Sequence, residues 1–288
     1  DGGTTALIIA ASTIDGNLTL TSGNSSGIID SGTVTVGGNL SATTDDNAGV
    51  ITLDTMAVDG TIALTTNSTG AATIVNDAAL TFAASTVGGA LTATATTGDI
   101  TDSGTLTITG AAIFKTRVDG SNIVLDSSSN AFSAAVTMIA DAGGEDFGNI
   151  TFVDSAAIDF ATSASSNGDL YINSSTDGTV GGNLSVTATT GNITDTVALA
   201  VAGTTTLVTS ADNATIVLGT ATNAFTGALT ITTNDSSGTD ADVTIDGGTT
   251  ALIIAASTID GDLTLTSDNV SGITDSGTVT VGGNLSAT

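Results

Sequence analysis

The sequence contains no proline, no cysteine, no histidine and no tryptophan, and only Lys115 and Arg117 carry a positive side chain. Without His or Cys, the chain cannot form a serine–histidine triad, a cysteine nucleophile or a common zinc site. The formal net charge of −27 excludes a nucleic-acid partner, because phosphate binding needs clustered cations. No apolar run is long enough to cross a bilayer, and the strongly apolar segment 6–11 predicts a buried strand instead.

The absence of proline is informative in a chain of 288 residues with 36 Gly. Proline lacks the backbone N–H, so it breaks any strand that is paired on both sides. A chain whose strands are all central would exclude proline throughout. The composition therefore favours an architecture in which every strand has a neighbour above and below it.

What the sequence does contain is repetition. Residues 246–288 repeat residues 1–43 with only four differences, so residues 1–245 form one long period and 246–288 begin the next copy. Within the period, residues 87–138 align on 180–231 at an offset of 93, and shorter phrases recur about every 22 residues. Fixed-period similarity is the signature of stacked repeats. We therefore expect residues 1–288 to form a single continuous β-solenoid of about 22 residues per rung.

Alternation of apolar and polar residues supports strands rather than helices. Segments such as 16–22 and 105–108 alternate Leu, Val or Ile with Thr between clusters of Gly, Asn, Asp and Ser. One such unit cannot bury its apolar face alone, but stacked units can. The offsets predict inward columns that hold Leu18, Leu40, Ile62, Leu91, Ile113, Leu184, Leu207 and Leu229 with their strand neighbours.

Two polar columns are expected as well. Asn17, Asn39, Asn183 and Asn284 occupy the same turn position of their units, where stacked side chains can hydrogen-bond along the column. The outward pairs of threonines would form arrays on the surface: Thr19 and Thr21, Thr33 and Thr35, Thr92 and Thr94, and Thr105 and Thr107.

After these exclusions, carboxylates are the only side chains left that could form a catalytic or metal-binding site. There are 29 acidic residues, and all except Glu145 are Asp, which favours placement in turns. Two clusters are candidate calcium sites, since hard cations take Asp and backbone oxygens: Asp45 with Asp46, and the group Asp235, Asp240, Asp242 and Asp246. The alternative is that these are solvated turn carboxylates. No cofactor is expected to be required.

The segments 180–195 (VGGNLSVTATTGNITD) and 97–110 (TGDITDSGTLTITG) resemble the repeats of filamentous-haemagglutinin-like giant bacterial surface proteins. The resemblance extends over nearly the whole chain as a style of repeat. It implies a right-handed parallel β-helix, secretion across a bacterial envelope, and a role as an adhesin or surface fibre.

The leading functional hypothesis is therefore a non-catalytic structural segment of a long extracellular filament or adhesin stalk. Its expected partners are further copies of the same repeat, in one chain or stacked end to end, with side-by-side association of filaments. One alternative is an ice-binding solenoid that uses the outward threonines. Another is a polysaccharide-cleaving β-helix enzyme that uses a pair of carboxylates.

Overall fold

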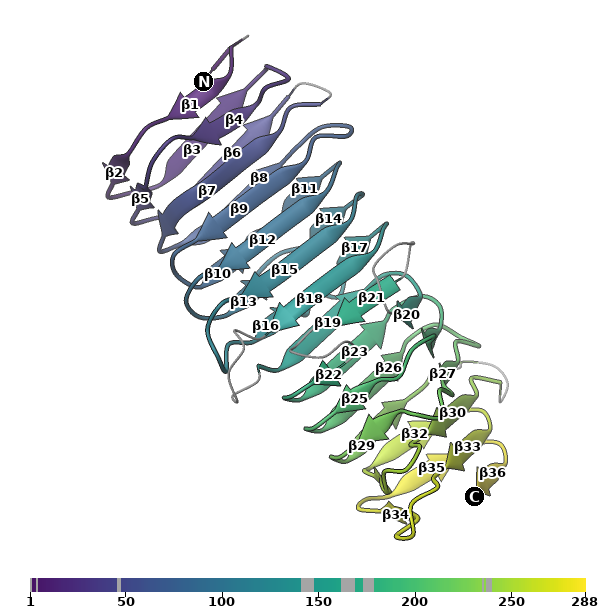
Figure 1. Cartoon of the computed structure of the whole chain (residues 1–288). Coiled ribbons are helices and arrows are strands. Elements are labelled where there is room, and N and C mark those ends of the chain that lie inside the picture. The colour runs from purple at the N-terminus through teal and green to yellow at the C-terminus, as the bar shows by residue number, and fades with distance from the viewer. Residues whose placement is uncertain are drawn as a thin grey trace.

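The computed structural model describes residues 2–3, 5–45, 48–140, 148–161, 169–172, 179–234, 236 and 240–288. These residues form strands and turns with no helix, and every pair of neighbouring strands is parallel. The strands stack as a β-solenoid of about 12 turns with about 22 residues per turn. Figure 1 shows the resulting rod, with the N-terminus at one end and the C-terminus at the other. The predicted fold class is confirmed.

The strands belong to two long sheets and one short sheet. The first sheet contains β1 (Leu7–Ile9), β2 (Ser12–Ile14), β4 (Ile28–Asp30), β5 (Val34–Val36), β7 (Ile51–Val58), β9 (Ala72–Asn76), β12 (Leu91–Ala95), β15 (Ala112–Thr116), β18 (Val136–Ala140), β20 (Ile158–Phe160), β21 (Asp169–Ile172), β24 (Ile193–Asp195), β27 (Ile216–Leu218), β30 (Val243–Asp246), β33 (Leu263–Thr266) and β36 (Leu285–Ala287). The second sheet contains β3 (Leu18–Ser22), β6 (Leu40–Thr44), β8 (Thr61–Thr65), β10 (Leu80–Phe82), β11 (Ser85–Val87), β13 (Ile100–Asp102), β14 (Leu106–Ile108), β16 (Ile123–Leu125), β17 (Ala131–Phe132), β19 (Ile150–Asp154), β23 (Leu184–Ala188), β26 (Thr205–Thr209), β29 (Leu229–Thr232), β31 (Leu252–Ile254), β32 (Ser257–Ile259), β34 (Ile273–Asp275) and β35 (Val279–Val281). The third sheet contains β22 (Thr179–Val180), β25 (Ala200–Val201) and β28 (Ala224–Phe225).

A typical turn places one longer strand on one face of the coil and two short strands, separated by a bend, on the opposite face. In the first turns β3 and β6 are the longer strands, while β4 and β5 are the short ones. Ser31 and Gly32 form the bend between β4 and β5, as expected for small residues that favour turns. The alternating burial of β6, with Leu40 and Ala42 buried, directs its apolar residues to the core between the two faces.

The long-strand face and the short-strand face exchange sheets along the coil. In the second sheet the single strand β8 is followed by both β10 and β11, because Phe82 pairs with Ile62 and Thr86 pairs with Thr65. In the first sheet the opposite change occurs where the eight-residue β7 is followed by the single strand β9. Further along the second sheet, β19 restores a long strand after β16, and β29 is again followed by two short strands, β31 and β32.

These exchanges place the two sequence copies in opposite sheets. β1 lies in the first sheet and pairs with β4, whereas β31, which has the same sequence LII, lies in the second sheet and pairs with β34. Likewise β3 is in the second sheet and its copy β33 is in the first. The 245-residue sequence period therefore advances the chain from one face of the coil to the other face.

Serine side chains complete the hydrogen bonding where a long strand is followed by two short ones. The bend between β10 and β11 leaves the N–H of Leu64 without a backbone acceptor, and Ser85 Oγ accepts it at 3.0 Å. The same bond joins Ile231 N–H to Ser257 Oγ, also at 3.0 Å. A buried N–H without an acceptor costs about 1–3 kcal/mol, so these hydroxyls stabilise the exchange.

At the opposite change, where a single strand such as β9 or β19 follows, an amide or carboxylate side chain completes the hydrogen bonding. Asn76, at the end of β9, is fully buried; its Oδ1 accepts the N–H of Val58 at 2.8 Å. Its Nδ2 donates to the carbonyl oxygens of Val58 and Ala79. At the end of β19, Asp154 Oδ1 accepts the N–H of Phe132 at 3.1 Å. Each exchange of this kind thus depends on one polar side chain inside the coil.

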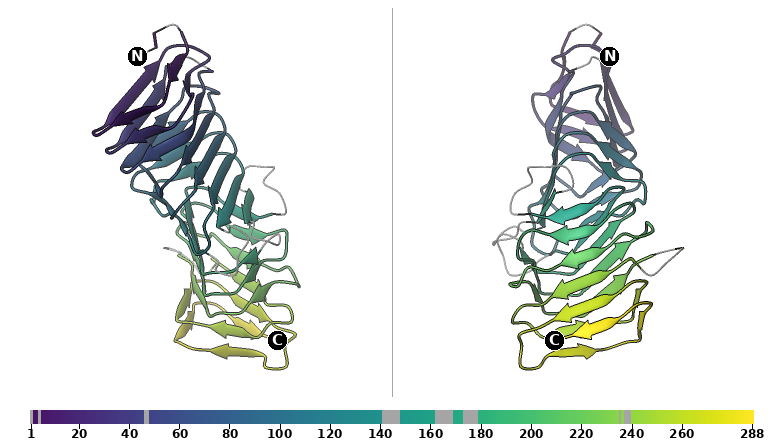
Figure 2. Two further views of the ribbon diagram at one scale, coloured as in Figure 1. Left: turned by 60° about the vertical axis from the view of Figure 1, so that its left-hand side comes forward. Right: turned by 90° about the vertical axis from the view of Figure 1, so that its right-hand side faces the viewer.

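An additional strand interrupts the regular stacking near the middle of the chain. In the first sheet β21 lies between β18 and β20, although it follows β20 in the sequence. In the same interval the second sheet passes from β16 through β19 to β23. Within this interval of the described coil, the first sheet therefore has one strand more than the second, since β21 and β20 stand opposite β19. Figure 2 shows that the long axis of the coil changes direction in this teal-to-green region, as a wedge on one side requires.

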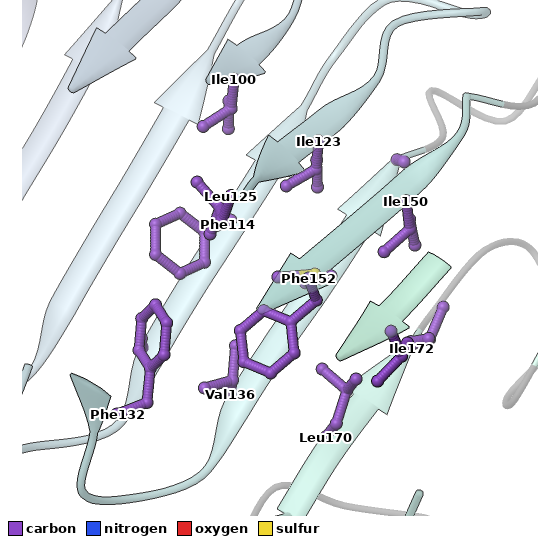
Figure 3. Close-up of a cluster of buried hydrophobic side chains, with 14 of the residues drawn as sticks. Ile100, Phe114, Ile123, Leu125, Phe132, Val136, Ile150, Phe152, Leu170 and Ile172 are labelled. Carbon is purple, nitrogen blue, oxygen red and sulfur yellow. The ribbon is translucent and has the colours of Figure 1, made fainter. Parts of the chain in front are cut away.

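The core is a continuous column of aliphatic side chains with a row of aromatic rings in its middle. The ring of Phe114 contacts those of Phe82 and Phe132 edge-on, at centroid distances of 6.1 and 6.0 Å, and Phe132 lies 5.2 Å from Phe152. Figure 3 shows three of these rings, Phe114, Phe132 and Phe152, between aliphatic residues of both sheets.

The predicted inward positions are correct except at one, although Leu91 and Ile113 lie in the first sheet and the other six in the second. Leu40, Ile62, Leu91, Leu184, Leu207 and Leu229 are buried, and Leu18 is partly buried against the core. The prediction that Ile113 points inward was wrong, because Ile113 is 39% exposed and Phe114 is buried instead. Leu91 pairs with Ala112, one residue before the predicted partner. A shift of one residue turns a strand side chain to the other face.

Each turn buries the turn before it. Leu40 and Leu285 occupy equivalent positions in the two sequence copies, yet Leu40 is 1% exposed and Leu285 is 63% exposed. The difference is that β8 pairs with β6 beyond Leu40, whereas β36 pairs only with β33 among the described residues. Core burial in this chain is thus a property of adjacent turns, as in other solenoids.

Candidate functional surfaces

The predicted asparagine column is a ladder at the turns. Asn17 Oδ1 accepts the backbone N–H of Asn39 at 2.8 Å, and Asn39 Oδ1 accepts the N–H of Thr61 at 2.9 Å. The side-chain oxygen of one turn therefore binds the backbone of the next turn. This confirms that stacked Asn residues hydrogen-bond along the coil, although the acceptor side chain is mainly paired with a backbone donor.

The later members show that one sequence position corresponds to two places in the coil. Asn183 precedes β23 of the second sheet; its N–H donates to Asn149 Oδ1 at 2.7 Å. Asn284 precedes β36 of the first sheet, and its N–H donates to Asp262 Oδ1 at 2.6 Å. The four predicted residues thus do not form one column, because the faces exchange between them.

The described calcium candidates are three exposed residues outside the strands and one half-buried residue at the end of β30. Asp242 is exposed, and its Oδ1 accepts the N–H of Asp262 at 2.7 Å, so it belongs to a turn ladder. Asp246 is half-buried and its Oδ1 accepts the N–H of Gly248 at 2.8 Å. Asp240 and Asp45 are exposed.

The two remaining predicted ligands, Asp46 and Asp235, lie outside the described residues. Within the part of the chain that the structure describes, no three acidic side chains converge as a metal site would require. In that same part, no helix is long and apolar enough to cross a membrane.

Asp154 is a buried carboxyl that the sequence analysis did not single out. It is 2% exposed, and burial raises its pKa above the ordinary value of 3.8, although the backbone N–H groups of Phe132, Ser155 and Ala156 act in the opposite direction. A Glu or Asp that ends a strand just before a bend is the only sequence signal for such a residue. Its position at a face exchange explains its burial.

This raised pKa predicts a pH dependence of stability. A carboxyl with a higher pKa in the folded state contributes stability that is complete below pH 3.8 and is lost as pH rises through the raised pKa. The free energy of unfolding of the wild type, minus that of Asp154→Asn, should therefore fall as the pH rises from below 3.8 through the raised pKa. Urea denaturation of both proteins across this range measures the difference. A difference that rises with pH would contradict the assignment.

The outward face of the second sheet is lined with threonine and carries no charge. In its described strands, the residues that alternate with the buried ones are the following: Thr19, Thr21, Ser41, Thr43, Thr61, Ala63, Thr65, Thr81, Thr86, Thr101, Thr107, Val124, Ala131, Thr151, Val153, Ser185, Thr187, Thr206, Val208, Thr230, Thr232, Ile253, Thr258, Thr274 and Thr280. Pairing aligns them in columns, as in the run from Thr43 through Thr65 to Thr86. The Thr81 and Thr101 hydroxyls lie 3.0 Å apart.

The outward face of the first sheet is different in character. It presents Ile8, which is 62% exposed, and Ile113, together with charged residues such as Lys115 and Asp159. Thr94, predicted to be an outward threonine, is only 5% exposed because it pairs with Val75 on one side and Lys115 on the other. Threonine also stacks on this sheet, in the run Thr52, Thr73 and Thr92, but here the threonine columns share the face with charged residues.

The architecture defines a repetitive parallel β-solenoid. A family model described as "Repeats of unknown function (DUF5649)" matches residues 69–139, 147–232 and 240–288, which together are more than half of the chain. The chain belongs to this family of repeats. No curated protein and no solved structure matches it.

Proposed function

We propose that this chain is a non-catalytic structural segment of a long extracellular bacterial filament or adhesin stalk, of the filamentous-haemagglutinin-like kind. The observation that carries the proposal is that strands of one turn pair in parallel with those of the turns on both sides, as Leu40 does with Leu18 and with Ile62. Such a fold lengthens without limit by adding repeats. The near-identity of residues 1–43 and 246–288 supports the same role, since a spacer needs no unique residues.

The partners that we propose are further copies of the same repeat, joined within one chain or stacked between subunits. Electron microscopy of the native protein, with diffraction from the fibres, tests the proposal. Thin filaments with an axial reflection near about 4.8 Å would support it. Isolated short particles without that repeat would refute it, and chain mass on a denaturing gel would distinguish one giant chain from a polymer.

Ice binding is the second candidate, and the uncharged threonine columns of the second sheet are the observation that favours it. Their members repeat along the coil at the strand spacing, about 4.8 Å. Thermal hysteresis of the purified protein is the direct test. Replacing Thr65 and Thr86 with Lys should abolish any hysteresis, whereas replacing Thr73 and Thr92 on the first sheet should leave it unchanged.

The net charge of −27 predicts that salt stabilises the protein. Carboxylates along a thin rod repel one another, and physiological salt screens this repulsion beyond about 8 Å. We expect a higher melting temperature in saline than in low-salt buffer with chelator. Calcium bound at the acidic clusters would add to the effect at equal ionic strength. Identical melting in both media would contradict the prediction for salt, and equal melting with magnesium and calcium would contradict a specific calcium site.

A further inference from the structure

A bulge in β7 interrupts the first sheet. Leu53 pairs with Ile74 and Met56 pairs with Asn76, so Asp54 and Thr55 together oppose the single residue Val75. Both Asp54 and Thr55 are exposed. Bulges of this kind redirect side chains and are common next to binding sites.

A buried carboxylate holds this bulge in place. Asp30, at the end of β4, is 7% exposed, and its oxygens accept the N–H groups of Asp54 at 3.1 Å and Thr55 at 2.8 Å. The same carboxylate accepts the hydroxyl of Thr55. Hydrogen bonds to a charged acceptor are stronger than neutral ones. The position of Asp54 on the surface is therefore set by a residue inside the neighbouring turn.

The bulge forms one wall of a cavity of about 280 Å³. Asp54 and Asp77 bring two carboxylates to it, and Arg117 brings a guanidinium. The remaining lining consists of three threonines and two apolar residues, namely Thr33, Thr55, Thr96, Met56 and Val75. A cavity that combines both signs of charge with an apolar wall can hold a ligand that carries both signs.

The strand order gives the scale of this charge separation. β7, β9, β12 and β15 are consecutive in the first sheet. The backbone of Arg117, just after β15, is therefore about 10 Å from that of Asp77 and about 14 Å from that of Asp54, at about 4.8 Å per strand. Arg117 lines the same cavity as Asp54 and Asp77, so a ligand that spans the cavity can reach both signs of charge.

The positive charge is not part of the repeat. Lys115 and Arg117 are the only cations in the chain, and the unit that aligns at an offset of 93 has Val208 and Ser210 in their places. A spacer has no need of such an exception. A binding site does need residues that the repeat lacks.

We propose that this cavity binds a zwitterion of the ω-amino acid type, with an ammonium group and a carboxylate separated by several bonds. Arg117 would hold the carboxylate with paired N–H donors, and Asp54 and Asp77 would hold the ammonium group. Val75 and Met56 would contact the carbon chain between the two ends. A zwitterion has no net charge, so the negative field of the protein neither repels it nor binds it elsewhere.

Titration of the intact chain with 6-aminohexanoate, followed by calorimetry or ligand-observed NMR, tests the proposal. We expect binding that weakens about tenfold or more in Arg117→Gln and in Asp77→Asn. Lys115→Gln, which changes the other cation outside the cavity, is the matched control and should bind as the wild type does. Hexanoate and hexylamine, which each carry one of the two charges, should bind about tenfold more weakly than 6-aminohexanoate.

Two results would overturn the proposal. One is the absence of binding by 6-aminohexanoate and by the shorter 4-aminobutyrate at about 10 mM, well above the millimolar affinity of a weak site. The other is binding that Arg117→Gln and Asp77→Asn leave unchanged. Both variants alter exposed side chains, so unchanged melting curves would show that any loss of binding is local. The result is independent of whether the chain forms filaments.

Discussion

Replacing Phe114 with alanine is expected to lower the free energy of unfolding by about 3–5 kcal/mol. Phe114 is fully buried, and its ring packs edge-on against Phe82 and Phe132, which lie in strands of the opposite sheet. Removing the ring leaves a cavity between close-packed turns that cannot collapse without breaking the strand pairing on both sides. Because neighbouring turns are coupled, the loss should reach the strands that flank β15.

Ile113→Ala is the matched control for this prediction. Ile113 is the adjacent residue, but its side chain points outward and is 39% exposed, so its loss should cost no more than about 1 kcal/mol. Urea denaturation gives the two free energies, and hydrogen exchange of β12, β15 and β18 locates the effect. Equal destabilisation by both variants would mean that β15 has the other register, with Ile113 inside.

Replacing Asn76 with alanine is expected to destabilise the protein by about 2–3 kcal/mol although it removes little apolar contact. Asn76 makes two buried hydrogen bonds, to the N–H and carbonyl of Val58, and a partly buried one to the carbonyl of Ala79. Alanine leaves these groups without partners at the point where the eight-residue β7 is followed by the single strand β9. We expect the turns between β7 and β10 to open locally before the rest of the coil.

Asn67→Ala provides the comparison at the surface. Asn67 is exposed and donates one hydrogen bond, to the carbonyl of Asp45 at 3.3 Å, so its replacement should change stability by no more than about 0.5 kcal/mol. Asn76→Asp is the more specific probe, because it keeps the acceptor for Val58 N–H but removes both donors. If Asn76→Ala unfolds like the wild type in hydrogen exchange across β7 and β9, the side chain is not required for the exchange of faces.

The amino-acid sequence by itself determined the class of fold. Alternation in segments such as 16–22, Gly and Asn at the turns and a 22-residue recurrence are local properties, and they predict parallel stacking before any contact is known. The ladder from Asn17 to Asn39 followed for the same reason, since a fixed step brings equal residues into register. These features depend on the chain near each residue, so a pattern is sufficient to find them.

Register was harder to predict because it depends on loop lengths. Ile113 was placed inside from a constant step of 22, but the step from Leu91 to its partner Ala112 is 21. One residue is enough to reverse every side chain in a strand. Phe114, unlike Ile113, contacts the buried rings of Phe82 and Phe132, and these two residues belong to strands of the other sheet.

Only the tertiary structure decided which face of the coil each repeat occupies. β3 and β33 have nearly the same sequence, yet they lie in opposite sheets. The threonine face, the buried Asp154 and the cavity between Asp54 and Arg117 all follow from where the faces exchange and strands bulge. The physical reason is that a strand acquires its sheet from the turns above and below it, through hydrogen bonds that no single repeat contains.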